Sequence, residues 1–122
     1  MINYNDKIFK AVQTSENGEV SGETVFHYQQ QGFLVSATYS GGAILFGHLI
    51  GLVDDKGVME IRYHHVNDRG DLMTGVCIST PEVLPNGKIR LHERWQWTSG
   101  DGSLGESIVE EVEESAYAFS ES

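Results

Sequence analysis

The chain has 122 residues, of which 39% are hydrophobic and 21% are charged, and its formal net charge is −10. This composition excludes a disordered chain, and no window approaches the roughly 18 unbroken apolar residues of a transmembrane helix. Because so acidic a surface repels phosphate backbones and anionic lipid, we expect neither a nucleic-acid partner nor a membrane partner.

The length is that of one typical domain, so we expect a single domain over residues 1–122, with the acidic tail from about residue 114 loosely held. Cys77 is the only cysteine, which excludes an internal disulfide and fits a reducing compartment. Residues 1–6 have neither the basic nor the apolar region of a secretory signal. These features predict a soluble, cytoplasmic protein.

Turn signals interrupt the sequence at nearly regular intervals, as a β meander requires. They are Asn17-Gly18, Gln31-Gly32, residues 40–42, residues 54–57, residues 67–70, residues 85–87 and residues 99–103. Between them lie runs of strand length. The predicted strands cover about residues 7–13, 24–30, 33–39, 43–53, 57–66, 71–80, 87–98 and 105–113.

Several runs alternate between apolar and polar residues, which predicts one buried and one wet face for each strand. The third run places on its inner face Phe33, Val35, Ala37 and Tyr39. The fifth run places inside Met59, Ile61, Tyr63 and His65. The seventh run places inside Ile89, Leu91, Trp95 and Trp97. Residues 43–53 differ, because that run is apolar on both faces.

The last run, residues 105–113, allows two interpretations. Residues 107–110 fit a helix capping box, but a closing strand is favoured because so long a meander needs its last edge paired. Glycines within the runs, Gly47, Gly51 and Gly75, indicate bends, bulges or close backbone approach. The predicted fold class is all-β, a single antiparallel up-and-down β-barrel of about eight strands, with a curved open sheet as the alternative.

Glu93 is the first candidate for chemistry. It lies on the apolar face of its predicted strand, between Leu91 and Trp95. A carboxylate buried there needs a hydrogen-bond donor, and its pKa rises if it has none. Glu93 is therefore either a ligand-binding or acid–base group inside the barrel, or a structural residue paired with an inward arginine or histidine or turned outward by a bulge.

Aromatic residues gather on the same predicted inner face. Trp95, Trp97, Tyr28, Tyr39 and Tyr63 point inward by the alternation, together with His65. Aromatic walls with a few polar groups are typical of small-molecule pockets, although each residue alone also fits a packed core. Taken with Glu93, this set is more polar than a sealed core needs and favours a cavity. We therefore predict a ligand site formed by Tyr28, Tyr39, Tyr63, His65, Glu93, Trp95 and Trp97.

Known catalytic and metal-binding motifs are absent from the sequence. His64 and His65 are adjacent in a predicted strand, so their rings point to opposite faces and cannot chelate one ion. There is no His-Glu-x-x-His pattern, no cysteine pair and no Gly-x-Ser-x-Gly nucleophile elbow. We expect no metal and no cofactor, and we interpret Cys77 as a buried core thiol.

Four stretches carry a resemblance to a known family: residues 39–42 (YSGG), 47–51 (GHLIG), 62–64 (RYH) and 89–101 (IRLHERWQWTSGD). Together they resemble short, uncharacterised bacterial proteins that often bear the automatic label n-acetylglutamate synthase. The resemblance extends from about Lys7 to Glu111. It implies an avidin-like or lipocalin-like (calycin-like) barrel.

The enzymatic label finds no support in the residues. Acetyl transfer by the usual acetyltransferase fold needs an αβ layout and a Gln/Arg-x-x-Gly-x-Gly/Ala loop at a helix N-terminus, and this sequence has neither. The biotin-binding motifs of avidin are missing as well. The resemblance therefore implies a shape and no particular ligand.

Three functions remain open. The first is a binding module that holds a small, partly apolar ligand in the barrel, oriented by Glu93. The second is a small enzyme in which Glu93 or His65 moves a proton, and the sequence leans away from it because no catalytic motif is present. The third is a structural role in which outward apolar residues of strand 43–53, such as Phe46 and Ile50, join barrels into a homo-oligomer.

Overall fold

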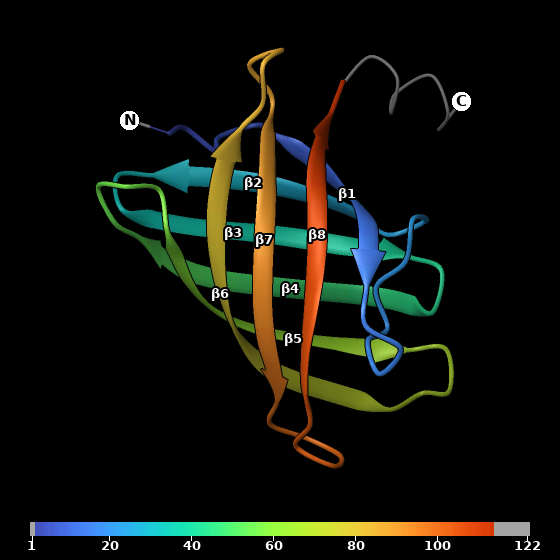
Figure 1. Ribbon diagram of the computed structural model, residues 1–122. Helices are drawn as coiled ribbons and strands as arrows, with labels where there is room; N and C mark the ends of the chain where they lie inside the picture. Colours follow the sequence, from blue (N-terminus) through green and yellow to red (C-terminus); the bar gives the residue numbers. More distant parts are fainter. Residues whose placement is uncertain (1, 114–122) are drawn as a thin grey trace.

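Eight antiparallel strands form one closed barrel in the computed structural model, which describes residues 2–113 (Figure 1). The strands are β1 (Ile8–Thr14), β2 (Val25–Gln31), β3 (Leu34–Gly41), β4 (Ile44–Val53), β5 (Met59–Asn67), β6 (Leu72–Val83), β7 (Ile89–Trp97) and β8 (Leu104–Val112). Each strand pairs with its sequence neighbours, and β1 pairs with β8 to close the sheet. The predicted fold class is confirmed, and the open sheet is excluded.

The closing segment is a strand, as favoured from the sequence. β8 hydrogen bonds to β7 on one side and to β1 on the other, so the sheet has no unpaired edge. The helical interpretation of residues 107–110 is wrong. None of the described residues forms a helix, and so none forms one long and apolar enough to cross a membrane. The predicted loose tail from about residue 114 lies outside the described residues.

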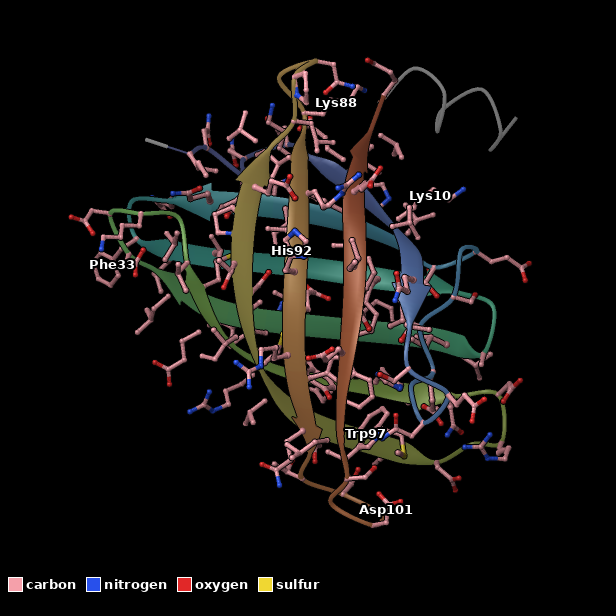
Figure 2. The ribbon with its side chains drawn as sticks, in the orientation of Figure 1. Lys10, Phe33, Lys88, His92, Trp97 and Asp101 are labelled. Atoms are coloured by element: carbon pink, nitrogen blue, oxygen red, sulfur yellow. The ribbon has the colours of Figure 1, made fainter. Side chains whose placement is uncertain are left out.

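Alternation sorts the side chains as predicted, with one exception. Val35, Ala37 and Tyr39 are buried. The apolar inner residues of β7 are buried as well, whereas Tyr63 and Glu93 are half-buried. Phe33 is 65% exposed, which contradicts its predicted place on the inner face. The reason is that Gly32 and Phe33 form the turn before β3, so the alternation of the strand does not extend to Phe33. Figure 2 shows its ring projecting from this turn, away from the barrel.

β4 is apolar on both faces and buries only one of them. Its inner face carries Ile44, Gly47 and Leu49, which are buried in the core. On its outer face Phe46 and Ile50 are 60% and 52% exposed. The described structure leaves this outer face uncovered.

The two ends of the barrel are filled differently. At the end where the even-numbered strands finish, the N-terminal segment folds inward and buries Tyr4 completely. The Tyr4 hydroxyl donates a hydrogen bond to the carbonyl oxygen of Gly57, and the Tyr4 ring packs against Phe9 and Tyr28. This end is therefore a packed aromatic plug. The longest connection, residues 15–24 between β1 and β2, lies at the opposite end.

Candidate functional site

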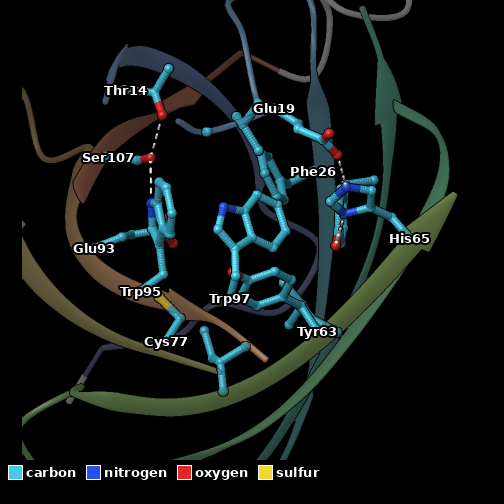
Figure 3. A pocket seen from close by; sticks show the side chains of 15 residues that line it. Thr14, Glu19, Phe26, Tyr63, His65, Cys77, Glu93, Trp95, Trp97 and Ser107 are labelled. Atoms are coloured by element: carbon cyan, nitrogen blue, oxygen red, sulfur yellow. Dashed lines mark hydrogen bonds and ion pairs between the residues drawn. The ribbon is translucent and has the colours of Figure 1, made fainter. Parts of the chain in front are cut away.

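An interior cavity of about 50 Å³ lies at the end of the barrel that the β1–β2 connection covers (Figure 3). Six of the seven predicted ligand-site residues line it: Tyr39, Tyr63, His65, Glu93, Trp95 and Trp97. The cavity exceeds the roughly 10–15 Å³ that one water molecule needs, and it is far smaller than the ~300–1,000 Å³ of pockets for drug-sized ligands. The interior is therefore partly hollow at this end, with room for a small molecule.

Tyr28, the seventh predicted residue, belongs to the packed end of the barrel. Its ring lies 5.2 Å from that of Phe9 and 6.0 Å from that of Tyr4, between ring centroids. Its buried hydroxyl has no hydrogen-bond partner among the described residues. The structure thus separates Tyr28 from the other six, because it lies farther along the barrel.

Glycines on neighbouring strands allow three aromatic rings to lie along the barrel wall. The cross-strand pairs are Tyr39 with Gly47, Tyr63 with Gly75, and Trp95 with Gly105. A Cβ atom at any of these glycines would overlap the far end of its partner ring. Because each ring extends sideways over a glycine instead of reaching across the interior, the centre stays open. The predicted close approach at Gly47 and Gly75 is confirmed.

The rings around the cavity are inclined to one another. The Trp97 ring lies 5.5 Å from that of Trp95 at 62°, and 5.9 Å from that of Tyr63 at 69°, between ring centroids. Phe26 and Tyr39 stack beside them with centroids 4.9 Å apart. Aromatic surfaces therefore enclose the cavity from several directions, as in Figure 3.

Glu93 brings a carboxyl group into these apolar surroundings. Its one hydrogen bond among the described residues comes from the Ser79 hydroxyl, at a long 3.4 Å. Burial raises the pKa of Glu93 to about 7, and the Ser79 hydrogen bond offsets only a little of that rise. No inward arginine or histidine pairs with Glu93 in the described part of the chain, so the alternative of an ion pair has no partner. The pairing of β7 with β6 and β8 has no register shift at Glu93, so no bulge turns it outward. The cavity therefore contains an acid that is partly protonated near neutral pH.

A second carboxylate at the cavity, Glu19, is fully paired. It accepts hydrogen bonds from His65 Nε2 at 2.8 Å, Asn67 Nδ2 at 3.0 Å and Arg69 Nη2 at 2.7 Å. Burial raises the pKa of Glu19, but the hydrogen bonds from these three partners outweigh it and hold the pKa below its ordinary value. In a neutral His65 ring, Nδ1 is then left to accept from the Tyr39 hydroxyl at 3.0 Å.

The β1–β2 connection covers part of the cavity and is held there by contacts with its wall. The indole N–H of Trp97 donates to the Asn17 carbonyl oxygen at 3.0 Å. The Asn17 side chain donates in turn to Leu104 in β8. Glu19 adds its hydrogen bonds to β5 and to the turn after it, so this connection is held at several points around the mouth of the barrel.

Sequence reasoning did not identify Glu19 as a site residue. It lies in a polar stretch between Thr14 and Glu23 that carries a turn signal and no alternation. Its role depends on how the connection crosses the mouth, and no local pattern encodes that path. Ser107, which accepts from the Trp95 indole N–H at 2.9 Å and bonds to Thr14 at 2.8 Å, was also not singled out.

The described residues contain no group of three or more histidine, cysteine, aspartate or glutamate side chains that could hold a metal ion. His48 and His64 pair across β4 and β5, with ring centroids 5.8 Å apart. Cys77 is buried and lines the cavity, and burial raises the pKa of its thiol well above the ordinary value. This thiol therefore stays protonated and behaves as a small apolar group.

Comparison with known proteins identifies a family. A family model described as avidin-like protein matches residues 2–112, nearly the whole described chain. No curated protein and no solved structure matches the sequence.

Proposed function

This chain belongs to the avidin-like protein family, and on that premise we propose that it is a binding protein whose barrel holds one small, partly apolar molecule. The family match and the closed barrel support the architecture, and they identify no ligand. We retain a cytoplasmic location as part of this proposal, because Cys77 is a free, buried thiol that fits a reducing compartment. The label n-acetylglutamate synthase gains no support from a barrel without helices among its described residues.

The observation that carries the proposal is the cavity itself. A barrel of eight strands can fill its interior with side chains, and the other end of this one does so with Tyr4, Phe9 and Tyr28. At the cavity end, glycines take the places of side chains and the rings lie along the wall. Cavities cost stability, so an open aromatic space with one carboxyl group is best explained by a ligand that fills it.

Tryptophan fluorescence tests this directly, because both tryptophans of the chain, Trp95 and Trp97, line the cavity. We expect some members of a small-fragment screen to change the emission and to raise the melting temperature, since a ligand of the native state stabilises it. Cys77→Leu places extra methyl groups in the cavity and should abolish both effects while the fold is kept.

The matched control is Ile78→Leu, on the exposed outer face of the same strand, which should bind like the wild type. Hits whose effects survive Cys77→Leu would place the binding elsewhere on the protein. A complete absence of hits at millimolar concentrations would contradict the binding function.

A proton-transfer enzyme is the second candidate, and the pKa of Glu93 near 7 favours it, because a general acid or base works best with a pKa near the operating pH. His65 suits such a role less well. Both of its ring nitrogens already have partners, Tyr39 and Glu19, so it has no free nitrogen to offer a substrate. Binding therefore accounts for more of the site than catalysis.

We also propose that a second copy of this chain covers the outer face of β4. That strand has no Asp, Glu, Lys or Arg, and Phe46 and Ile50 expose large apolar surfaces on it. Leu34 on β3 pairs with Leu52 and widens the apolar strip. In a chain of net charge −10, an uncharged strip is where two copies repel each other least.

Light scattering at two protein concentrations tests this assembly. We expect a dimer or larger species for the wild type, and a monomer for Ile50→Lys, because a lysine at the centre of the strip would be buried unpaired. Leu104→Lys, an exposed leucine on β8 at the other side of the barrel, is the matched control and should leave the assembly intact. A wild-type monomer at both concentrations would contradict the proposal.

A further inference from the structure

The carboxyl group of Glu93 lacks a positively charged partner, although the protein provides one for the other carboxylate at the cavity. Glu19 is neutralised by Arg69 at 2.7 Å and hydrogen bonded by His65, whereas Glu93 has only the Ser79 hydroxyl. Buried carboxylates normally have a cation or several hydrogen-bond donors beside them. Among the described residues, no cation and no second hydrogen-bond donor lies beside the Glu93 carboxyl group.

Basic residues near Glu93 in sequence cannot supply the charge. Arg90 bonds to Glu110 at 2.7 Å, and His92 bonds to Glu82 at 2.8 Å. His92 and Arg94 flank Glu93 directly and therefore point to the opposite, outer face of the strand, where both are exposed. A cation beside Glu93 would have to come from a ligand.

The walls of the cavity suit a cation of a particular kind. Trp95, Trp97 and Tyr63 surround the space with rings inclined at 62° and 69°, and aromatic faces attract positive charge. A bare metal ion would need several oxygen or nitrogen ligands, and the described residues provide no such cluster. A primary ammonium needs up to three hydrogen-bond acceptors, and the lining oxygens of Glu19, Tyr39 and Ser107 already have partners.

We propose that the cavity binds a small organic cation of the methylated or quaternary ammonium class, held between Trp95, Trp97 and Tyr63 and neutralised by Glu93. This rests on the proposed binding function and names its ligand class. A quaternary ammonium has no N–H donors to satisfy, and its methyl groups fit apolar walls. The net charge of −10 adds a field that attracts cations to the protein.

The test compares choline with 3,3-dimethyl-1-butanol, a neutral molecule of the same shape in which carbon replaces the charged nitrogen. Binding is followed by tryptophan fluorescence at pH 8, above the Glu93 pKa of about 7, with sodium chloride added to equalise ionic strength. We expect the wild type to bind choline at least about tenfold more tightly than the alcohol. Glu93→Gln should remove that preference, and its affinity for the alcohol should change by less than about threefold.

Equal affinities in the wild type would overturn the cation inference and leave the small-molecule binding function in place. A choline preference that survives Glu93→Gln would also overturn it, because the charge would then be recognised elsewhere. Wild-type protein that binds neither molecule would overturn it as well, while the fragment screen decides the binding function separately. Glu60→Gln, a change of the same kind on the outer face of β5, should behave like the wild type.

Discussion

Glu93→Gln should stabilise the protein by about 2 kcal/mol more at pH 8 than at pH 5, measured as the free energy of unfolding without ligand. The cause is the cost of ionising the Glu93 carboxyl inside an apolar cavity. Its pKa is about 7 in the folded protein, against an ordinary value of 4.5. Glutamine has nearly the same shape and never ionises.

The direction follows from proton binding in the two states. At pH values well below 4.5, Glu93 is protonated in both the folded and the unfolded chain and has no effect on stability. Between 4.5 and 7 the unfolded chain loses the proton while the folded protein keeps it, so wild-type stability falls by about 1.4 kcal/mol for each pH unit. Above pH 7 Glu93 is ionised in both the folded and the unfolded chain, and the stability of the wild type stays lower by the full free-energy cost of ionising the buried carboxyl.

Urea unfolding of both proteins, followed by tryptophan emission, measures this difference. Comparing the two pH values cancels any constant effect of the glutamine amide, and the pH dependence of all other groups is common to both proteins. Glu106→Gln, an exposed carboxylate on β8, should show no pH-dependent gain. A gain from Glu93→Gln that is the same at pH 5 and pH 8 would mean that the carboxyl is not buried as described.

Sequence patterns predicted the barrel because its determinants are local. Several strands show period-two alternation between turn signals, and the order of strands follows from the short hairpins that join most of them. The prediction for Phe33 is wrong because alternation alone does not show at which residue the turn ends and the strand begins. β8 can be predicted as a strand only from the need to pair the last edge of the sheet, since its own residues also fit a helix.

The lining of the cavity could be predicted only in part. Alternation identifies which residues point inward, and it found six that line the cavity. Alternation does not give the position of a side chain along the barrel axis, so it does not distinguish Tyr28, at the packed end, from the residues that line the cavity. It also misses Glu19, whose position depends on contacts with residues roughly fifty positions away. The unfilled space itself depends on pairing aromatic residues with glycines across strands, and that requires the register.

Gly105→Ala should lower the free energy of unfolding by about 3 kcal/mol, from overpacking and a lost buried hydrogen bond. The far end of the Trp95 ring occupies the place that a Cβ of residue 105 would need. Gly105 does not have a positive φ, so space alone opposes the alanine. The displaced indole must leave the Ser107 hydroxyl, 2.9 Å from its N–H, and move into the cavity. Ligand binding should therefore be lost together with stability.

A double-mutant cycle with Trp95→Leu separates this mechanism from a general effect of replacing glycine. Leucine is too short to reach residue 105, so the added methyl group has nothing to displace in the double variant. We expect the double variant to be more stable than the sum of the single changes implies, by at least about 1 kcal/mol.

Gly22→Ala, where the nearest atom to an added Cβ is 3.7 Å away, should change stability little. Strict additivity of Gly105→Ala and Trp95→Leu would show that the ring does not rest on the glycine. The open interior would then need another cause, because the ring would no longer be held along the wall by the absence of a side chain.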